Sequence, residues 1–135
     1  MDNKYLCPTC YTHIDEHEAS ECLDAWAGED VMGYDYTGNK PELKERWIGR
    51  PDRYSSRIAA AWELVEKVAD LHGCQFSIER VGKPWEIRCG KYGAVVSGGD
   101  LQYERPDLTL AVYADSAPLA ITRAAIKATL GRSES

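Results

Sequence analysis

The sequence predicts an α+β domain in which helices cover an antiparallel sheet of about four strands, in the order α-α-β-β-β-β-α. Apolar residues recur at helical spacing in three segments, and between residues 76 and 112 they recur at every second position instead. The 135 residues, 44% of them hydrophobic, suffice for one ordinary globular domain. We therefore expect a domain of residues 20–135 preceded by a short Cys/His-containing extension of residues 1–19.

Two helices are expected before the sheet. Apolar side chains share one helical face between about residues 18 and 32, and Gly33 is suited to end that helix. The clearer helix follows Ser55 and Ser56, either of which is a good N-cap, and Gly73 is suited to end it. Its helical spacing predicts a core face made of Ile58, Ala61, Trp62, Val65, Ala69 and either Leu71 or His72.

The segment between these helices, residues 34–54, is polar and contains glycine, proline and several aromatic residues. We expect a long loop there that holds at most a short strand or ribbon. Loops of this length inside a compact domain are often functional, so this segment is a first place to look for a binding site.

The change to period two predicts the strands. Residues 81–84 are typical of a hairpin connection and residues 98–100 of a turn, because each contains glycine, which takes a positive φ readily. The alternating positions that predict the four strands are Phe76 and Ile78; Trp85, Ile87 and Cys89; residues 93–97; and Leu108, Leu110 and Val112.

The last helix is rich in small residues. Asp115 or Ser116 can cap it, Pro118 suits its first turn, and Gly131 is expected to end it. A face of small side chains allows a helix to approach a sheet closely, so we expect this helix to pack on the sheet.

Charge and hydrophobicity exclude several classes of protein. The formal net charge is −6, which argues against binding to a nucleic-acid polymer because such binding usually needs a basic face. A small anionic ligand remains compatible, since a few local arginines suffice. No apolar run approaches the roughly 18–20 residues that span a bilayer. The first residues lack a signal-peptide pattern, so we expect a cytoplasmic protein.

Recognisable catalytic patterns are absent from the sequence. There is no nucleophile elbow, no phosphate-binding Gly-x-x-x-x-Gly-Lys and no His-Glu-x-x-His. His72 falls at a predicted helix end, and Glu63 and Glu66 fall on a predicted polar helix face. We therefore expect a binding protein and not an enzyme.

The N-terminal extension carries a metal-site pattern. Cys7 and Cys10 form a Cys-x-x-Cys pair, which is half of many zinc sites, and structural zinc takes four nitrogen or sulfur ligands. The remaining ligands are expected among His13, His17 and Cys22. An odd count of five cysteines without a secretory signal argues against disulfides. The alternative is an ordered turn with reduced thiols and solvated histidines; a redox role is disfavoured because a thioredoxin-like βαβ setting is missing.

The second half of the long loop is the most basic part of the chain, and it leads into a predicted helix start, where free N–H groups favour anions. Arginines there can contact phosphate in bidentate fashion, and aromatic rings can stack on a base. The alternative is that these arginines pair with carboxylates on a solvated face. The candidate ligand-binding residues are Arg50, Arg53, Tyr54, Ser55 and Arg57.

Arg123 is a further candidate, because it lies among apolar and small residues of the last helix. A guanidinium is costly to bury without partners, so its place there fits a ligand site or a seam between two subunits. The alternative is that the side chain projects into solvent between buried neighbours.

Three stretches of the chain resemble one family of phage proteins. They are LDA followed by VMGY (residues 23–34), YSS followed by IAAAWELVEK (54–67), and ADSAPLAITRAA (114–125). These stretches resemble the phage ABA sandwich domain, and the likeness spans about residues 20 to 130. The resemblance implies a phage- or prophage-encoded protein with a sheet layered by helices, and it leaves the extension of residues 1–19 outside the family pattern.

The resemblance also shapes the functional expectation. Some phage proteins of this general kind sequester cyclic nucleotide signals of bacterial immune systems such as Thoeris, which implies an oligomeric nucleotide sponge with arginine-lined pockets. An alternative is a phage inhibitor, anti-CRISPR-like or other, that binds a host or defence protein through an acidic surface. A third is an accessory factor whose zinc-bearing extension docks on a partner.

Overall fold

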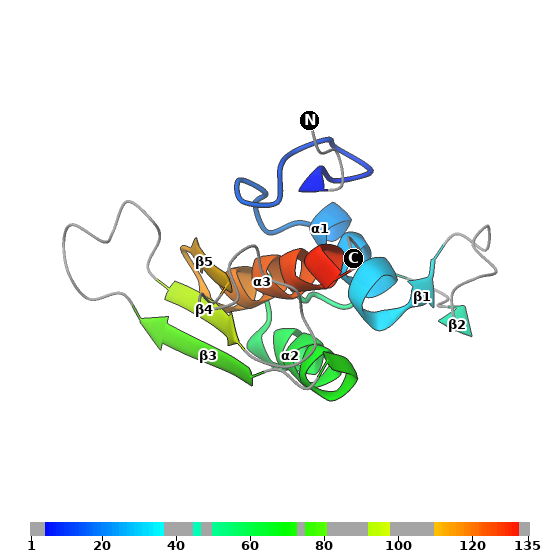
Figure 1. Ribbon diagram of the computed structural model, residues 1–135. Helices are drawn as coiled ribbons and strands as arrows, with labels where there is room; N and C mark the ends of the chain where they lie inside the picture. Colours follow the sequence, from blue (N-terminus) through cyan, green and yellow to red (C-terminus); the bar gives the residue numbers. More distant parts are fainter. Residues whose placement is uncertain are drawn as a thin grey trace.

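The computed structural model describes residues 5–36, 45–46, 50–72, 75–80, 92–97 and 110–132. Its elements confirm the α+β class, with two helical segments before an antiparallel sheet and one helix after it (Figure 1). In chain order they are α1 (Glu21–Ala27), the π-helical turn η2 (Gly28–Met32), β1 (Tyr34–Asp35), β2 (Glu45–Arg46), α2 (Ile58–His72), β3 (Gln75–Arg80), β4 (Tyr92–Ser97), β5 (Leu110–Ala114) and α3 (Ala117–Arg132).

The main sheet has the order β3-β4-β5, and both pairings are antiparallel. Ala94 and Val96 of β4 and Val112 of β5 are buried on the inner face, in contact with the helices. On the outer face Tyr113 pairs with Gly93, and its ring lies so close that a Cβ on Gly93 would meet it at 2.9 Å. An aromatic ring that covers a strand glycine in this way shields backbone that would otherwise face water.

Several expected features lie outside the described residues. These are the strand at Trp85, Ile87 and Cys89, the connections at residues 81–84 and 98–100, Leu108, and the Gly73 helix stop. The long loop after Gly33 does hold a short ribbon, in which β1 and β2 pair in parallel.

The first helix begins later than the apolar pattern predicts. Ser20 is its N-cap, and the Ser20 hydroxyl accepts a hydrogen bond from the Leu23 backbone N–H, so that residues 18–20 stay outside the helix. The predicted end is confirmed: Gly33 adopts a left-handed conformation with φ 80°.

The core-facing side of α2 differs from the prediction. Trp62 is 48% exposed and Ile58 53% exposed, whereas the unpredicted Leu64 is fully buried. The reason is that α2 packs mainly on α3 and only slightly on β3, which rotates its contact face toward Ala61, Leu64, Val65 and Val68. The predicted serine cap is also wrong: α2 begins at Ile58, so that neither Ser55 nor Ser56 directly precedes it, and the Ser55 hydroxyl donates to Asp24 of α1 instead.

α3 is the central element. It contacts α1, η2, α2, β4 and β5, and Figure 1 shows it running through the middle of the molecule. Small residues allow this close approach on several sides at once. Its buried residues include Ala120, Ile121, Thr122, Ala124, Ala125, Ile126 and Ala128.

Candidate functional site: a thiol–imidazole cluster beside a polar pocket

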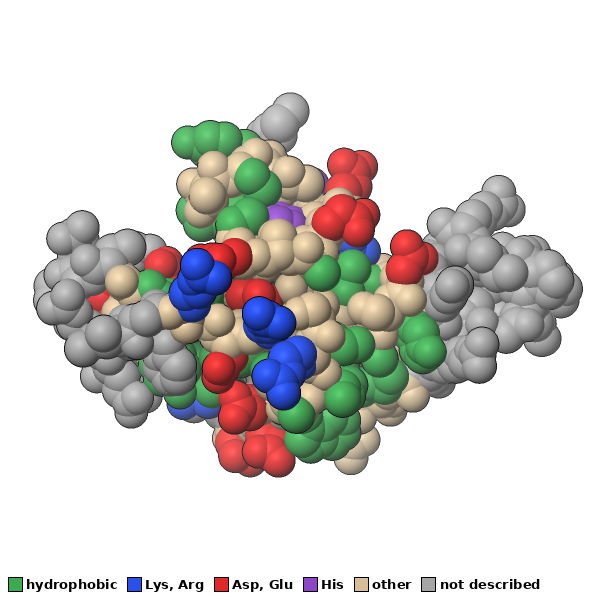
Figure 2. Space-filling view, turned by 180° about the vertical axis from the view of Figure 1, so that it is seen from behind, with side chains coloured by type: hydrophobic (Ala, Val, Ile, Leu, Met, Phe, Trp, Pro, Cys, Tyr) green, Lys and Arg blue, Asp and Glu red, His purple; other side chains and the backbone are tan. Residues whose placement is uncertain are grey.

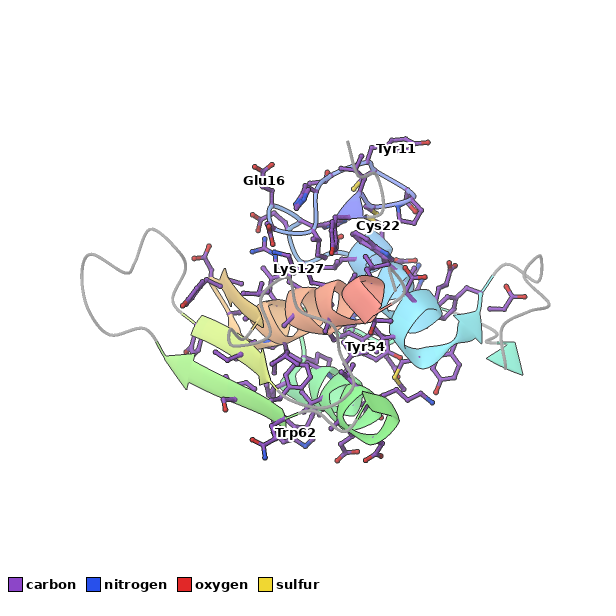
Figure 3. The ribbon with its side chains drawn as sticks, viewed as in Figure 1. Tyr11, Glu16, Cys22, Tyr54, Trp62 and Lys127 are labelled. Carbon is purple, nitrogen blue, oxygen red and sulfur yellow. The ribbon has the colours of Figure 1, made fainter. Side chains whose placement is uncertain are left out.

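Residues 5–17 form a compact hairpin, here called the knuckle, above α1 (Figure 3). Leu6 and His13 form an antiparallel bridge, and the Cys7 N–H donates to the Thr12 carbonyl at 2.9 Å. Tyr11 completes the turn with a positive φ of 61°, and its exposed side chain marks the tip. This turn places the two cysteines of the Cys-x-x-Cys pair on the same side.

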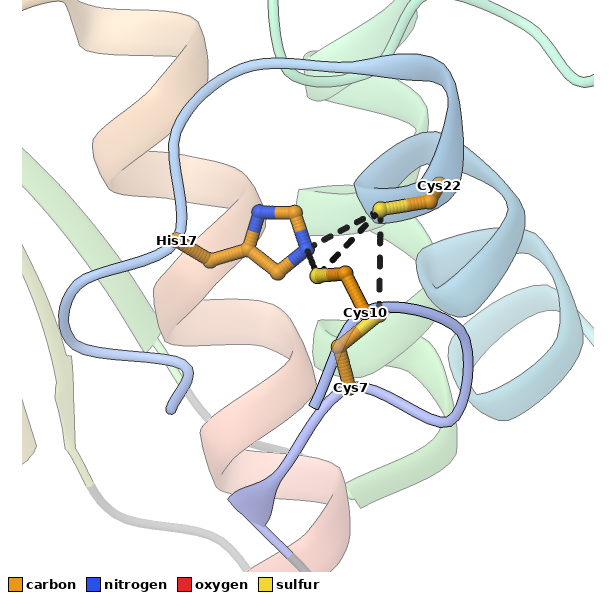
Figure 4. A group of neighbouring side chains, drawn as sticks. All are labelled: Cys7, Cys10, His17 and Cys22. Carbon is orange, nitrogen blue, oxygen red and sulfur yellow. Dashed lines mark hydrogen bonds between the residues drawn. The ribbon is translucent and has the colours of Figure 1, made fainter. Parts of the chain in front are cut away.

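Four side chains converge beneath the turn: Cys7, Cys10, His17 and Cys22 (Figure 4). Their three Sγ atoms and one imidazole nitrogen all lie within 4.8 Å of one another. The Cys22 Sγ lies 3.8 Å from the Cys7 Sγ and 3.7 Å from the Cys10 Sγ. The His17 Nε2 lies 3.3 Å from the Cys10 Sγ and 3.2 Å from the Cys22 Sγ.

These four separations are close to the edge lengths of a metal-centred tetrahedron. With metal–sulfur bonds of about 2.3 Å and metal–nitrogen bonds of about 2.0 Å, two sulfurs are separated by about 3.8 Å and a sulfur and a nitrogen by about 3.5 Å. The two S···S distances agree closely, and the two S···N distances are a few tenths of an ångström shorter. The four residues are therefore positioned to hold one metal ion.

The imidazole of His17 has the orientation that ligation requires. Its Nδ1 lies 2.8 Å from the Glu18 carbonyl, which only accepts, so Nδ1 carries the hydrogen. Nε2 then keeps its lone pair and faces the sulfurs. A hydrogen bond from the second ring nitrogen is the usual way in which proteins fix a metal-binding histidine. The ring of Trp26 lies against this imidazole, with 6.3 Å between centroids.

The thiols differ in their tendency to ionise. Hydrogen bonds with the Thr12 side chain and backbone lower the pKa of Cys10 to about 6, and its side chain is exposed. Burial raises the pKa of Cys22 to about 11. The Thr9 N–H donates to the Cys7 Sγ at 3.5 Å. A cation among these sulfurs stabilises all three as thiolates.

α3 anchors the knuckle through two basic side chains. Arg123, 6% exposed, donates from Nε and Nη2 to the His17 carbonyl at 2.9 and 2.6 Å, and from Nη1 to the Tyr113 carbonyl at 3.0 Å. Lys127 donates to both oxygens of the Asp15 carboxylate at 2.8 and 3.0 Å, and Figure 3 shows it directly below the knuckle. Arg123 thus has an internal role that the sequence did not reveal.

A polar pocket of about 260 Å³ lies beside the cluster. One wall comes from the segment that links two cluster residues, His17 and Cys22, and from the first turn of α1. The other comes from the segment that leads into α2. The lining residues are Ala19, Ser20, Glu21, Asp24, Arg50, Pro51, Arg53 and Ser56.

Asp24 and Ser55 join the two walls. The Asp24 carboxylate accepts from the Ser55 backbone N–H at 2.8 Å and from its hydroxyl at 2.6 Å. The Ser55 hydroxyl in turn accepts from the Ser20 N–H at 3.2 Å. Burial raises the pKa of Asp24, while the bonds from Ser55 oppose that rise.

The predicted binding residues separate into two groups. Arg50 and Arg53 line the pocket, and Arg57 is exposed but is not among the lining residues. Tyr54 lies fully buried in the core, where burial raises its pKa, and Ser55 and Arg123 are bound to other parts of the protein. The lining residues that sequence reasoning missed include Ser20, Glu21 and Asp24, for which only the capping character of Ser20 was a usable signal.

The predicted metal ligands also separate. Cys7, Cys10, His17 and Cys22 come together, whereas His13 lies outside the cluster. The His13 Nδ1 accepts from the Asp15 N–H at 3.1 Å, and its ring lies near that of Tyr5. His13 pairs with Leu6 in the bridge and bonds locally to Asp15, whereas the His17 Nε2 faces the cysteine sulfurs.

Comparison with known proteins identifies relatives of the fold. The model of the family described as Phage ABA sandwich domain matches residues 25–126. A solved structure, a crystal structure at 2.0 Å of a phage protein from Bacillus cereus ATCC 14579, superimposes with a TM-score of 0.58 at 20% sequence identity, covering 84% of this chain and 94% of that one. No curated protein matches. Within the described residues, every helix is too short or too polar to cross a bilayer. The four clustered residues precede the segment that the family model matches.

Proposed function

The chain belongs to the phage ABA sandwich domain family, and on that premise we propose that it is a non-catalytic phage protein that sequesters a small anionic nucleotide, an immune signal of the infected bacterium. It acts in the host cytoplasm as a counter-defence protein. The observation that carries this proposal is the pairing of Arg50 and Arg53 with the hydroxyl-bearing Ser20 and Ser56 around one pocket.

The chemistry of the lining suits a nucleotide. Guanidinium groups bind phosphate in bidentate fashion, and serine hydroxyls add further hydrogen bonds. The carboxylate of Glu21 can accept from the hydroxyls of a ribose or the amino group of a base. A pocket of about 260 Å³ is at the small end of ligand sites, so one copy holds about one nucleotide unit. A cyclic dinucleotide then needs two copies, which agrees with the expected homo-oligomer.

Native mass spectrometry of protein freshly purified from bacterial cells tests this proposal. We expect a multimer that releases a nucleotide-sized mass on denaturation. A species that carries no nucleotide, and whose mass is unchanged when cyclic nucleotides are added, contradicts the proposal.

Two matched arginine variants test whether the nucleotide binds in this pocket. Arg53→Ala removes a pocket guanidinium, whereas Arg57→Ala removes an exposed one that lies outside the lining. We expect the first to weaken nucleotide binding by about 10- to 100-fold, corresponding to one charged hydrogen-bonded contact, and the second to leave it unchanged. Equal losses in both variants mean that the effect is one of overall charge.

We propose further that the cluster of Cys7, Cys10, His17 and Cys22 holds a structural zinc ion. Three thiolates and one imidazole are a usual closed tetrahedral set for zinc, and four protein ligands leave no open position for catalysis. Zinc with three thiolates carries a net charge of −1. The buried Arg123 guanidinium, bonded to the backbone of His17, compensates that charge.

A second candidate function is the inhibition of a host or defence protein. It is favoured by the outer face of α2, where the exposed apolar side chains of Ile58 and Trp62 lie four residues apart. Exposed acidic residues accompany them, namely Glu63, Glu66 and Asp70. Figure 2 shows acidic and hydrophobic side chains side by side at the lower end of the molecule, where α2 lies. Trp62→Asp abolishes inhibition in this case and leaves nucleotide binding unchanged.

A further inference from the structure

We propose that the metal centre builds the ligand pocket, so that the pocket is formed only in the metal-bound protein. The metal is then a built-in requirement for ligand capture and not merely a support for the N-terminal segment. This inference rests on the proposed function for the bound zinc ion and for the nature of the ligand. The coupling itself follows from the way in which the cluster and the pocket share one stretch of chain.

The first step is the connection through the chain. Ala19, Ser20 and Glu21 line the pocket, and they lie between two cluster residues, His17 and Cys22. Only four residues separate the two ligands, so fixing both ends leaves the intervening segment few conformations. Metal binding therefore determines the position of one pocket wall.

The second step is the small apolar burial of that segment, which apart from the metal is held mainly by the polar bonds from Arg123 and Lys127. Of residues 5–20, sixteen in number, only Cys7, Ile14 and His17 are buried. Two of these three are themselves cluster residues, so Ile14 alone supplies a fully buried apolar side chain that is independent of the metal. Segments with so little apolar burial depend on a metal or another cross-link for a fixed structure.

The third step is the set of hydrogen bonds that connects the pocket wall near the cluster with the opposite wall. The Ser20 hydroxyl lies 3.5 Å from the Cys22 Sγ and accepts from the Leu23 N–H, while the Ser20 N–H donates to Ser55. Ser55 is bonded to Asp24 and is followed by Ser56, which lines the opposite wall. Each bond alone is modest, but together they make the second wall sensitive to the position of Ser20.

The coupling is expected to be local. The lining residues belong to the segment before α1, to α1 itself and to the segment before α2, and none belongs to the main sheet or to α3. Loss of metal should therefore loosen the pocket while the buried core around α3 persists.

Amide hydrogen exchange on the full-length chain tests the inference without knowledge of the natural ligand. The zinc-loaded protein is compared with the same protein after removal of zinc by a chelator under reducing conditions. The Cys10→Ser variant, altered at an exposed ligand, provides a second metal-free form, and His13→Ala is the matched control because His13 lies outside the cluster. Binding of adenosine monophosphate is measured on all four samples.

The expected result is faster exchange at residues 18–24 and 53–57 in both metal-free forms, with unchanged exchange in α3, and at least a 10-fold loss of adenosine monophosphate binding. Unchanged exchange at those residues overturns the inference, whatever happens to binding. Faster exchange together with equal binding in all samples also overturns it, because the pocket then functions without the metal. If exchange depends on zinc but no sample binds the nucleotide, the coupling stands and the proposed nucleotide function fails.

Discussion

The knuckle and α3 hold their shapes by opposite means, although they lie in contact. α3 is surrounded by other elements, and its small side chains are nearly all buried. The knuckle buries only three of its thirteen residues, Cys7, Ile14 and His17, and two of these belong to the thiol–imidazole cluster. One region is stabilised by apolar burial, and the other by convergent ligands if the proposed zinc ion is bound; a short extension can then be ordered without a hydrophobic core of its own.

The largest expected effect is the all-or-none loss of metal on removal of a cluster ligand. His17→Ala leaves three ligands, so zinc content per chain should fall from about one to near zero under dilute chelator. His13→Ala, four residues away, should retain the zinc. Elemental analysis of the purified variants measures both. Equal retention of metal in the two variants would falsify the ligand assignment and, with it, the contrast between the two regions.

A core substitution addresses the other region. Ile121→Ala creates a cavity in the fully buried face of α3 and should reduce the free energy of unfolding by about 2–5 kcal/mol. Urea denaturation measures this loss, and Ile58→Ala on the exposed side of α2 is the control, with an expected change within about 0.5 kcal/mol. We expect Ile121→Ala to retain zinc at low denaturant; loss of zinc there means that the knuckle depends on the core more than its contacts indicate.

Arg123 links the two regions, so its replacement sharpens the comparison. Arg123→Lys keeps the charge but cannot reach both the His17 and Tyr113 carbonyls with a single ammonium group. We expect zinc affinity to fall by about 10-fold, as for a partner that orients a metal ligand, and thermal stability to fall as well. Competition with a chromogenic zinc chelator gives the affinity. An unchanged affinity means that His17 is oriented by its Glu18 contact alone.

The smallest expected effect on stability is at Ser20, which lies between the knuckle and α1. Ser20→Ala removes the N-cap of α1 and should cost about 1 kcal/mol in the free energy of unfolding. Ser20→Asp, which can also cap, should restore most of that stability in thermal denaturation experiments. Failure of aspartate to rescue the loss would show that contact with the Cys22 thiol, and not capping, is the role of Ser20.

The fold class could be predicted from the sequence, and so could a group of five candidate metal ligands that contains the four clustered residues, because both predictions depend on local spacing. Apolar periodicity predicts helices and strands, and Cys7-x-x-Cys10 implies a turn whatever surrounds it. That His13 is not part of the cluster could not be predicted from the sequence, because it depends on the direction in which its side chain points in the folded hairpin. The orientation of α2, which leaves Trp62 half exposed, could not be predicted either, because it depends on which neighbouring element the helix packs against.

Contacts between distant parts of the chain explain the remaining differences. Arg123 is 106 residues from His17 in sequence, and Ser55 is 31 from Asp24. Each pair is polar and buried, and no periodic pattern marks such partners in a single sequence. Two of the arginines predicted to bind a ligand, Arg50 and Arg53, do lie at the pocket because the basic loop and the pocket wall are the same segment.

The contact between Trp26 and His17 gives the protein its own optical probe. An indole next to an imidazole changes its emission when that ring gains a proton or a metal ion, because both alter the electron-accepting character of the quencher. Trp26 also donates to the Asp30 carboxylate at 2.7 Å, which restrains the indole and keeps its surroundings uniform. Uptake of the proposed metal is therefore expected to change the contribution of Trp26 to the combined emission of the chain's four tryptophans, with no label attached.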